Sequence, residues 1–179
     1  MSSDVVLCEA ADVSAARLLA IRQMLDAAFD GRFNDDDWDH SLGGTHAMIV
    51  DGEHVLAHAS VVPRTIAVGT RAVRVGYVEG VGVAPALHGQ GLGSAVIVAI
   101  NGVIGDRFEL GMLSTGEWKF YERLGWERWR GPTWTVHHDG RRERTADEDD
   151  GIMAYRTERS IDLGASAAIT CEHRAGDCW

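Results

Sequence analysis

Glu-Gly-Val-Gly-Val-Ala-Pro-Ala-Leu-His-Gly-Gln-Gly-Leu-Gly-Ser, residues 79–94, is the stretch of this sequence that decides the fold. A run with strand propensity, 73–83, leads into it, and an apolar run compatible with a helix, 94–104, follows it. The first N–H groups of a helix lack partners within the helix, and the helix dipole places positive charge at that end. Glycine also lets the backbone approach a ligand closely, so this order predicts a phosphate-binding turn. The alternative is a glycine-rich turn that binds nothing.

Two common phosphate motifs do not fit this turn. The P-loop requires a lysine, and no lysine lies between Gly69 and Ser114. The dinucleotide motif requires G-x-G-x-x-G and an acidic residue about 20 residues further on. Gly89, Gly91 and Gly93 have a different spacing. The turn therefore belongs to another class of phosphate site.

The hexapeptide 88–93, His-Gly-Gln-Gly-Leu-Gly, resembles the Q/R-x-x-G-x-G/A pyrophosphate loop of the GCN5-related N-acetyltransferases (GNAT). His88 stands where Gln or Arg is usual. A second segment, Phe120-Tyr121-x-x-x-Gly125-Trp126, is similar to the family segment whose tyrosine lies beside the acetyl-CoA sulfur. The resemblance implies acetyl-CoA as cosubstrate and a set of residues that bind it. These are Val81, Gly82, Val83, His88, Gly89, Gln90, Gly91, Leu92, Gly93 and Ser94.

The predicted elements follow the order β-α-α-β-β-β-α-β-α-β, which is the order of the GNAT fold. Helices are expected at 15–29, 35–42, 94–104 and 117–124, and strands at 5–8, 45–50, 54–62, 71–83, 110–114 and 167–171. A late hairpin is expected to pair 133–138 with 153–155 across a polar, mobile connection. We therefore expect an α/β (α+β) acyl-CoA N-acyltransferase fold. Its central sheet is mixed, mostly antiparallel and flanked by helices, with a splayed central strand.

Length and cysteine usage limit the class of protein. The 179 residues fit one domain, 1–179. The sequence shows no apolar run long enough for a membrane span and no signal peptide, so a cytoplasmic protein is expected. Cys8, Cys171 and Cys178 are widely spaced without a C-x-x-C pattern, which indicates reduced thiols. The histidines show no metal-binding spacing either, so no metal is expected.

The acidic balance limits the partners. A net charge of −10 argues against a nucleic-acid partner, because such proteins neutralise phosphates with Lys and Arg. It is compatible with a cationic substrate drawn into an acidic cleft. Solubility alone is the simpler explanation of the same charge.

Several segments resemble one branch of the family, the aminoglycoside 2′-N-acetyltransferases. They are 37–47 (D-W-D-H-S-L-G-G-T-H-A), 76–81, 110–114, 130–133 and the tail 168–179, which ends R-A-G-D-C-W. The resemblance spans nearly the whole chain and implies an aminoglycoside substrate and a homodimer. It also implies a set of substrate-binding residues. These are Asp37, Glu79, Ser114, Asp149, Asp150, Asp177 and Trp179, the last through its carboxylate.

These residues also have structural explanations. Asp37 could cap its helix, and Asp149 and Asp150 could be solvated loop charges, with the choice between them left open. Glu79 is harder to explain in this way, because a mid-strand carboxylate is costly to bury without partners. One departure from the branch concerns the substrate: Arg32 stands where an acidic residue is expected.

We expect direct attack of the amine on the thioester rather than an acyl-enzyme, because no cysteine falls near the strand 79–83 or the predicted helix with Tyr121. Glu79 acts as the base, through a water molecule, and the Trp179 carboxylate shares this work. A main-chain N–H at Val81 or its neighbour holds the oxyanion, and Tyr121 protonates the leaving thiolate. Two alternatives remain: a GNAT enzyme for another polyamine, amino sugar or protein amine, and a non-enzymatic CoA-binding module. Glu79 and Tyr121 together favour an enzyme, since a mere binder needs neither.

Overall fold

The computed structural model describes residues 4–179, and the chain divides into two units. The first unit contains the residues up to Val62 and Val78–Val103, and the second contains Pro63–Tyr77 and Ile104–Trp179. Three long elements contribute residues to both units: β3 (His54–Val68), β4 (Arg71–Val83) and α3 (Leu92–Arg107). The single domain expected from the sequence stays a prediction.

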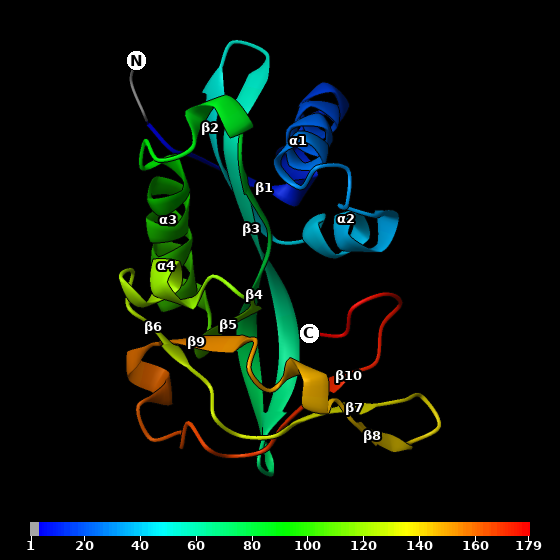
Figure 1. The fold of residues 1–179 in the computed structure, drawn as a ribbon. Coiled ribbons are helices and arrows are strands. Elements are labelled where there is room, and N and C mark those ends of the chain that lie inside the picture. Colours follow the sequence, from blue (N-terminus) through cyan, green and yellow to red (C-terminus); the bar gives the residue numbers. More distant parts are fainter. Residues whose placement is uncertain (1–3) are drawn as a thin grey trace. The chain divides into compact units, whose positions relative to one another are not determined.

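The first unit places helices on both sides of its strands. Its other elements are β1 (Val6–Glu9), α1 (Ala15–Ala28), α2 (Asp35–Ser41), β2 (Thr45–Asp51) and the short 3₁₀ helices Ala10–Asp12 and Pro85–Leu87. β2 pairs antiparallel with both β1 and β3. Figure 1 shows α1 and α2 on one side of β2 and β3, with α3 on the other.

Local signals in the sequence explain where these helices start and what they bury. The hydroxyl of Ser14 accepts a hydrogen bond from the N–H of Arg17 at 3.2 Å, which caps α1. The buried face of α1 carries Ile21, Met24 and Leu25. This face packs on strand residues such as Met48 and Val55, and the cluster forms the core of the unit.

The second unit contains most of the shorter strands. Its elements are β5 (Leu110–Ser114), α4 (Trp118–Glu122), β6 (Trp126–Arg128), β7 (Thr133–Val136), β8 (Arg142–Arg144), β9 (Ile152–Arg156), β10 (Ile169–Glu172) and the 3₁₀ helices Ala146–Glu148 and Glu158–Ser160. β5 pairs parallel with β4, from Val75–Leu110 to Tyr77–Met112, and antiparallel with β9. β10 pairs parallel with β7 and antiparallel with β3.

These pairings confirm the expected α+β fold with a mixed, mostly antiparallel sheet. The hydrogen-bonded strand order is β6-β9-β5-β4-β3-β10-β7-β8, with β2 also on β3 and β1 on β2. The paired residues of β4 and β5 end at Tyr77 and Met112, and Gly80–Val83 follow beyond them in β4. Within residues 4–179 no helix has the length and apolarity that a membrane crossing requires.

The late hairpin was predicted with the wrong partner. β7 pairs with β8, and residues 153–155 lie in β9, which pairs with β5 and β6. The run 141–150, expected to be a mobile connection, contains β8 and a 3₁₀ helix. β8 has no apolar alternation. Its arginines Arg142 and Arg144 lie over the ring of Trp134, 4.9 and 5.6 Å from the centroid, and such cation–π contacts leave no period-two signal.

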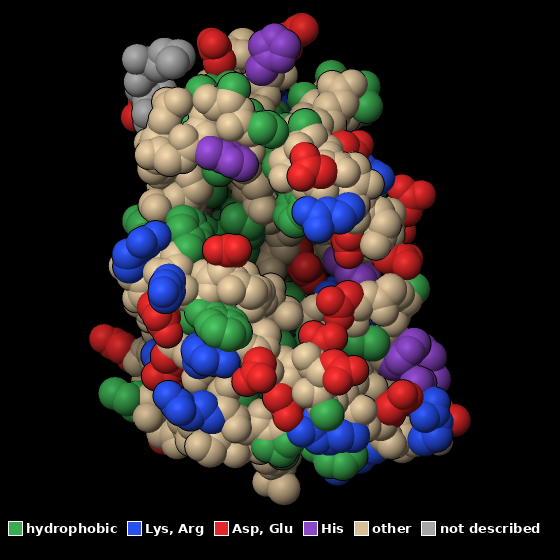
Figure 2. Space-filling model, in the orientation of Figure 1, with side chains coloured by type: hydrophobic (Ala, Val, Ile, Leu, Met, Phe, Trp, Pro, Cys, Tyr) green, Lys and Arg blue, Asp and Glu red, His purple; other side chains and the backbone are tan. Residues whose placement is uncertain are grey.

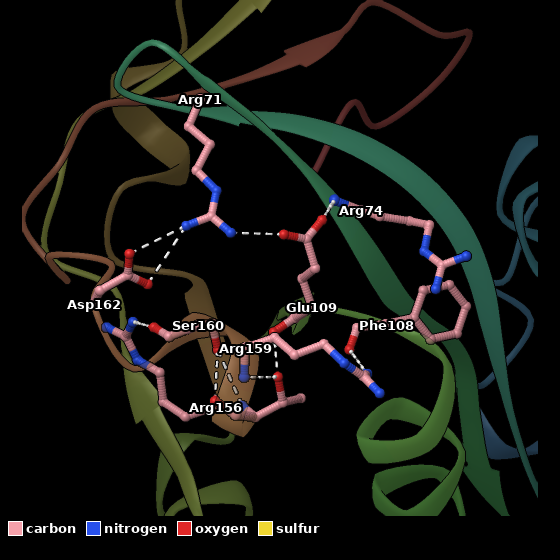
Figure 3. Close-up of polar contacts among 9 residues, drawn as sticks. Arg71, Arg74, Phe108, Glu109, Arg156, Arg159, Ser160 and Asp162 are labelled. Carbon is pink, nitrogen blue, oxygen red and sulfur yellow. Dashed lines mark hydrogen bonds and ion pairs between the residues drawn. The ribbon is translucent and has the colours of Figure 1, made fainter.

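A polar network joins the β3–β4 turn, the end of α3 and the β9–β10 connection in the second unit (Figure 3). The Glu109 carboxylate accepts hydrogen bonds from the Arg71 guanidinium at 2.7 Å and from the Arg74 N–H at 2.9 Å. The Arg159 guanidinium donates to the carbonyls of Gly105 and Phe108 at 3.2 and 2.9 Å. The Gly105 carbonyl is one of the last C=O groups of α3, which need partners from outside the helix, and Phe108 directly follows the helix.

Candidate functional site

The glycine loop of the first unit has a backbone that only glycine adopts readily. Gly89 and Gly91 have φ values of +77° and +83°. A Cβ atom at either position would meet nothing within 4 Å, so conformation rather than space requires glycine there. The loop opens α3, which begins at Leu92, two residues before the predicted start. The first N–H groups of α3 and the positive end of its dipole suit an anion at this loop.

His88 ties the loop to the strand before it. Its Nε2 lies 3.0 Å from the carbonyl oxygen of Val83. Because a carbonyl oxygen only accepts, this nitrogen carries the proton and donates. The imidazole therefore joins the end of β4 to the start of the glycine loop, and it does so at the position where Gln or Arg is usual in the resembling family.

Glu79 sits beside an irregularity of β4. Gly80 has a φ of +55°, and a Cβ atom there would approach the Cβ of Ser41 to 3.0 Å. The Glu79 carbonyl accepts a hydrogen bond from the Ser60 hydroxyl at 3.2 Å, and the Gly80 carbonyl binds the imidazole of His58 at 2.7 Å. Two successive carbonyls of β4 are thus held by side chains of β3. The Glu79 side chain itself is half-buried.

Asp37 has the structural role that the sequence left open. α2 begins after Asn34, whose side chain accepts a hydrogen bond from the Asp37 N–H at 3.0 Å. The Asp37 carboxylate in turn accepts from the Asn34 N–H at 3.1 Å, which completes a capping box. Figure 2 shows acidic side chains gathered over α2, whose first turn carries Asp35, Asp36 and Asp37. The second oxygen of the Asp37 carboxylate leaves capacity for a further donor.

Tyr121, in the second unit, lies in an aromatic cluster. Its ring packs edge-on against Phe120 and Trp126, with centroids 4.9 and 5.9 Å apart. Burial, with a smaller contribution from the Glu117 carboxylate, raises the pKa of the Tyr121 hydroxyl above its ordinary value. The hydroxyl carries its proton at neutral pH, as an ordinary tyrosine does, and burial makes it a weaker acid.

Ser114 ends β5, opposite Ile152 of β9. A Cβ atom at Gly151 would come within 2.8 Å of the Ser114 hydroxyl oxygen. Glycine at position 151 therefore leaves room for the hydroxyl, which is half-buried.

The structure separates the roles of Asp149 and Asp150. The Asp149 carboxylate binds the Arg144 guanidinium and accepts hydrogen bonds from the N–H and the hydroxyl of Thr133, both at 2.9 Å. The pairing with Arg144 in particular lowers the pKa of Asp149 to about 2. Asp150 is an exposed carboxylate, 3.3 Å from the Arg128 guanidinium. Asp149 is thus already neutralised within the chain, whereas Asp150 keeps most of its surface in solvent.

Glu148 is a candidate that the sequence did not single out. It ends the 3₁₀ helix Ala146–Glu148 and is half-buried. Burial raises the pKa of its carboxyl, and the neighbouring carboxylates of Asp177 and Asp147 raise it further. A positively charged group bound near these carboxylates would relieve the repulsion between them. The signal for this site lay in the run of acids 147–150, of which only Asp149 and Asp150 were predicted to bind substrate.

The tail is held at each of its last residues. The Trp179 side chain is 3% exposed, and its indole N–H donates to the Thr145 hydroxyl at 3.1 Å. The Trp179 backbone N–H donates to the Asp177 carboxylate at 3.0 Å, and the Asp177 carbonyl accepts from Arg174 at 2.8 Å. These bonds hold residues 177–179 in place, with the Asp177 carboxylate near Glu148.

The predicted site residues are therefore divided between the units. The first unit holds Asp37, Glu79 and the residues 81–83 and 88–94, and the second holds Ser114, Tyr121, Asp149, Asp150, Asp177 and Trp179. No group of three or more metal-binding side chains is found among the described residues.

The chain is similar to known acetyltransferases in sequence. Residues 11–129 match the family model described as an acetyltransferase (GNAT) domain. The chain is also 39% identical over 162 residues to an aminoglycoside 2′-N-acetyltransferase from Mycolicibacterium fortuitum, which covers 88% of this chain and 83% of that protein.

Solved structures share the fold at low sequence identity. A GNAT family N-acetyltransferase (YhbS) from Escherichia coli in complex with CoA has a TM-score of 0.69 at 14% identity, over 97% of this chain and 94% of that one. An acyl-CoA N-acyltransferase from Pseudomonas aeruginosa has a TM-score of 0.61 at 18% identity, over 85% and 98%. Some other matches belong to much longer chains. The chain spans 34% of a GCN5-related N-acetyltransferase from Kribbella flavida, which covers 72% of this chain at 22% identity with a TM-score of 0.58.

Proposed function

Because the chain belongs to the acetyltransferase (GNAT) family, and within it to the aminoglycoside 2′-N-acetyltransferases, we propose that it transfers an acetyl group from acetyl-CoA to the 2′-amino group of an aminoglycoside. The main support is the 39% identity to the relative of that name over 88% of the chain. The family match includes residues of both units, which supports treating 1–179 as one acetyltransferase domain.

The proposed acetyl-CoA site lies in the first unit. The pyrophosphate is placed at the glycine loop, where the φ values of Gly89 and Gly91 turn the backbone toward the start of α3. The main chain of Val81, Gly82 and Val83 pairs with the pantetheine arm like an added strand. The residues that hold the cosubstrate are then 81–83 and 88–94, with His88 bracing the loop against β4.

The proposed reaction moves one proton before the bond forms. An ammonium group of the drug loses a proton to Glu79 through a water molecule, and its nitrogen then attacks the thioester carbonyl carbon. The N–H of Val81 stabilises the charge that develops on the carbonyl oxygen, an interaction typically worth about 3 kcal/mol. The carbon–sulfur bond breaks, and Tyr121 gives its proton to the leaving thiolate. The attacking nitrogen, which is positively charged after the bond forms, loses its second proton, and this proton restores the Tyr121 hydroxyl through water. The role does not depend on a shifted pKa, because a tyrosine hydroxyl with its ordinary pKa of about 10 already carries its proton at neutral pH.

The drug's ammonium groups need acidic acceptors. We place in the substrate site Asp37, Ser114, Asp150, Asp177 and Trp179. We add Glu148, because burial and the repulsion of its acidic neighbours raise the pKa of its carboxyl and a bound ammonium group would offset that repulsion. Asp149 is assigned a supporting role, since its oxygens are occupied by Arg144 and Thr133.

The assignments of compartment, metal and partners rest on the composition of the sequence, and the assignment of oligomeric state rests on the resemblance. We propose a metal-free, cytoplasmic homodimer that binds neither nucleic acid nor membrane. The free thiols of Cys8, Cys171 and Cys178 are consistent with a reducing compartment.

Two related drugs test the regiochemistry. Tobramycin carries a 2′-amine, whereas kanamycin A has a 2′-hydroxyl and keeps its 6′-amine. We expect thiol release from acetyl-CoA with tobramycin and none with kanamycin A. Turnover with both would contradict the 2′ assignment. Tight CoA binding without turnover of either drug would favour another amine substrate or a CoA-binding module.

A further inference from the structure

Two buried histidines lie next to the irregular segment of β4. His46 of β2 and His58 of β3 are both fully buried. The Nδ1 atom of His46 lies 2.9 Å from the Nε2 atom of His58, and the two ring centroids are 5.2 Å apart. Neither imidazole takes part in the proposed chemistry, yet a buried pair of this kind must distribute its protons in a definite way.

The Gly80 carbonyl fixes that distribution. It lies 2.7 Å from the Nδ1 atom of His58 and can only accept, so Nδ1 of His58 carries a proton. The Nε2 atom of a neutral His58 is then an acceptor, and Nδ1 of His46 must donate to it. Burial lowers the pKa of both imidazoles, that of His58 to about 3, so His58 is uncharged at neutral pH. The hydrogen bonds thus point in one direction: His46 donates to His58, and His58 donates to the Gly80 carbonyl. We call this pair of hydrogen bonds the relay.

The Gly80 carbonyl shares a peptide group with the Val81 N–H. A peptide group is planar, and in the trans form its C=O and N–H point in opposite directions. A donor that holds the Gly80 oxygen therefore also sets the direction of the Val81 N–H. A hydrogen bond accepted at the carbonyl further polarises the group and makes its N–H a better donor.

The neighbouring contacts restrict the same segment. The Ser60 hydroxyl holds the preceding carbonyl, that of Glu79, at 3.2 Å. Gly80, with φ at +55°, leaves no room for a Cβ beside Ser41. Hydrogen bonds and close packing thus determine the backbone on both sides of Gly80.

We propose that His58, held by His46, is a positioning residue for acetyl transfer, which aims and polarises the Val81 N–H through the Gly80 carbonyl. This inference rests on the proposed function. It adds two residues that touch neither acetyl-CoA nor drug but set the direction of the N–H that stabilises the developing oxyanion.

Substitution of His58 tests the donor directly. His58→Leu removes the hydrogen bond, whereas the amide nitrogen in His58→Asn reaches roughly the place of Nδ1 and can restore it. We expect His58→Leu to lower kcat with tobramycin roughly tenfold to hundredfold, because an oxyanion donor is misdirected. The Kd for acetyl-CoA should change less than about threefold, since the glycine loop is untouched, and His58→Asn should recover most of kcat. His54→Leu, on the exposed start of β3, is the matched control.

Three results would overturn the proposal: a folded His58→Leu with wild-type kcat, an Asn variant no better than Leu, or a parallel loss of kcat and CoA affinity. Imidazole ¹⁵N spectra of the wild-type protein at pH 7 give a test that needs neither turnover nor a variant. We expect a proton on Nδ1 of both His46 and His58, and a proton on Nε2 of His58 would disprove the relay. Absence of wild-type turnover with any aminoglycoside would contradict the proposed function instead, and the ¹⁵N spectra would still decide the relay.

Discussion

The imidazole of His88 closes the glycine loop onto β4, because its Nε2 donates a hydrogen bond to the carbonyl oxygen of Val83 at 3.0 Å. The side chain is exposed, so it is the hydrogen bond rather than burial that makes it useful. The bond spans the segment between the strand end and the loop that we assign to the pyrophosphate. Loss of this hydrogen bond should therefore weaken acetyl-CoA binding more than it lowers the free energy of unfolding.

We expect His88→Ala to weaken acetyl-CoA binding. One hydrogen bond of this kind contributes about 1 kcal/mol, so the Kd should rise roughly fivefold. His88→Gln restores a donor of the usual family type and should stay near the wild-type Kd. Isothermal titration calorimetry measures both constants. If His88→Ala and the wild type have the same Kd for acetyl-CoA, His88 does not brace the glycine loop for binding.

Gly91→Ala should weaken acetyl-CoA binding through the backbone alone. A Cβ at this position meets no atom within 4 Å, but φ is +83°, where a side chain costs about 1–2 kcal/mol. Gly102→Ala is the matched control, because Gly102 lies in α3 with ordinary φ and free space. We expect a lower Tm and a higher Kd for Gly91→Ala, and an unchanged Kd with an equal or higher Tm for Gly102→Ala. Equal behaviour of the two variants in calorimetry and thermal melts would count against a strained loop.

The parts of the fold that the sequence predicts well are those with strong local signals. The glycine loop is marked by turn chemistry, and β4 by its recurring valines between two turns. The capping residues Ser14 and Asn34 explain why α1 and α2 begin where they do. In these elements local preference and tertiary environment agree, so the pattern alone is sufficient.

The parts that the sequence missed are held by long polar side chains. β8 carries arginines rather than apolar residues, and its pairing with β7 depends on Arg144 reaching both Trp134 and Asp149. Contacts of this kind depend on the position of the partner in space, which no periodicity encodes. The same cause left the choice between Asp149 and Asp150 open and hid Glu148, since adjacent acids look alike until their partners are known.

Asp149 and Glu148 should respond differently to loss of charge. Asp149→Asn breaks the pairing with Arg144, and charged hydrogen bonds of this kind contribute about 1.5–3 kcal/mol. We expect a lower free energy of unfolding, measured by urea denaturation. Glu148→Gln removes no internal partner and relieves repulsion with Asp177, so its stability should be unchanged or higher. Its KM for tobramycin should rise several-fold, and a KM that rises only in Asp149→Asn would reverse our assignment.

Glu79→Gln tests the proposed base. The amide keeps the size of the side chain but cannot take a proton, and loss of a general base typically lowers the rate by about 10²–10⁴-fold. We expect kcat to fall in this range, while acetyl-CoA still binds at the glycine loop. Raising the pH should partly restore the rate of the variant, because more of the drug is then already deprotonated. A variant with wild-type kcat at pH 7 would move the base to another group, with the Trp179 carboxylate as the next candidate.

The buried histidines also predict how stability depends on pH. His58 has a pKa of about 3 in the folded state against 6.5 in an ordinary environment, chiefly because of burial. Above pH 6.5 both states are neutral and the group has no effect. As the pH falls from 6.5 toward 3, the unfolded chain binds a proton that the folded chain does not, so stability is lost progressively. At pH 5 the loss attributable to His58 is about 2 kcal/mol.

Urea denaturation at pH 7 and pH 5 measures this loss. Burial lowers the pKa of His46 as well, with a hydrogen bond to the Leu42 backbone and the Glu9 carboxylate opposing part of the shift, so the wild type should lose more than His58 alone predicts. His58→Asn cannot bind the proton, and its loss between the two pH values should be smaller by about 2 kcal/mol, whatever its stability at pH 7. His54→Asn, exposed on the same strand, should keep the wild-type slope. If His58→Asn keeps that slope as well, His58 is protonated in the folded protein, and the neutral relay through Gly80 does not form.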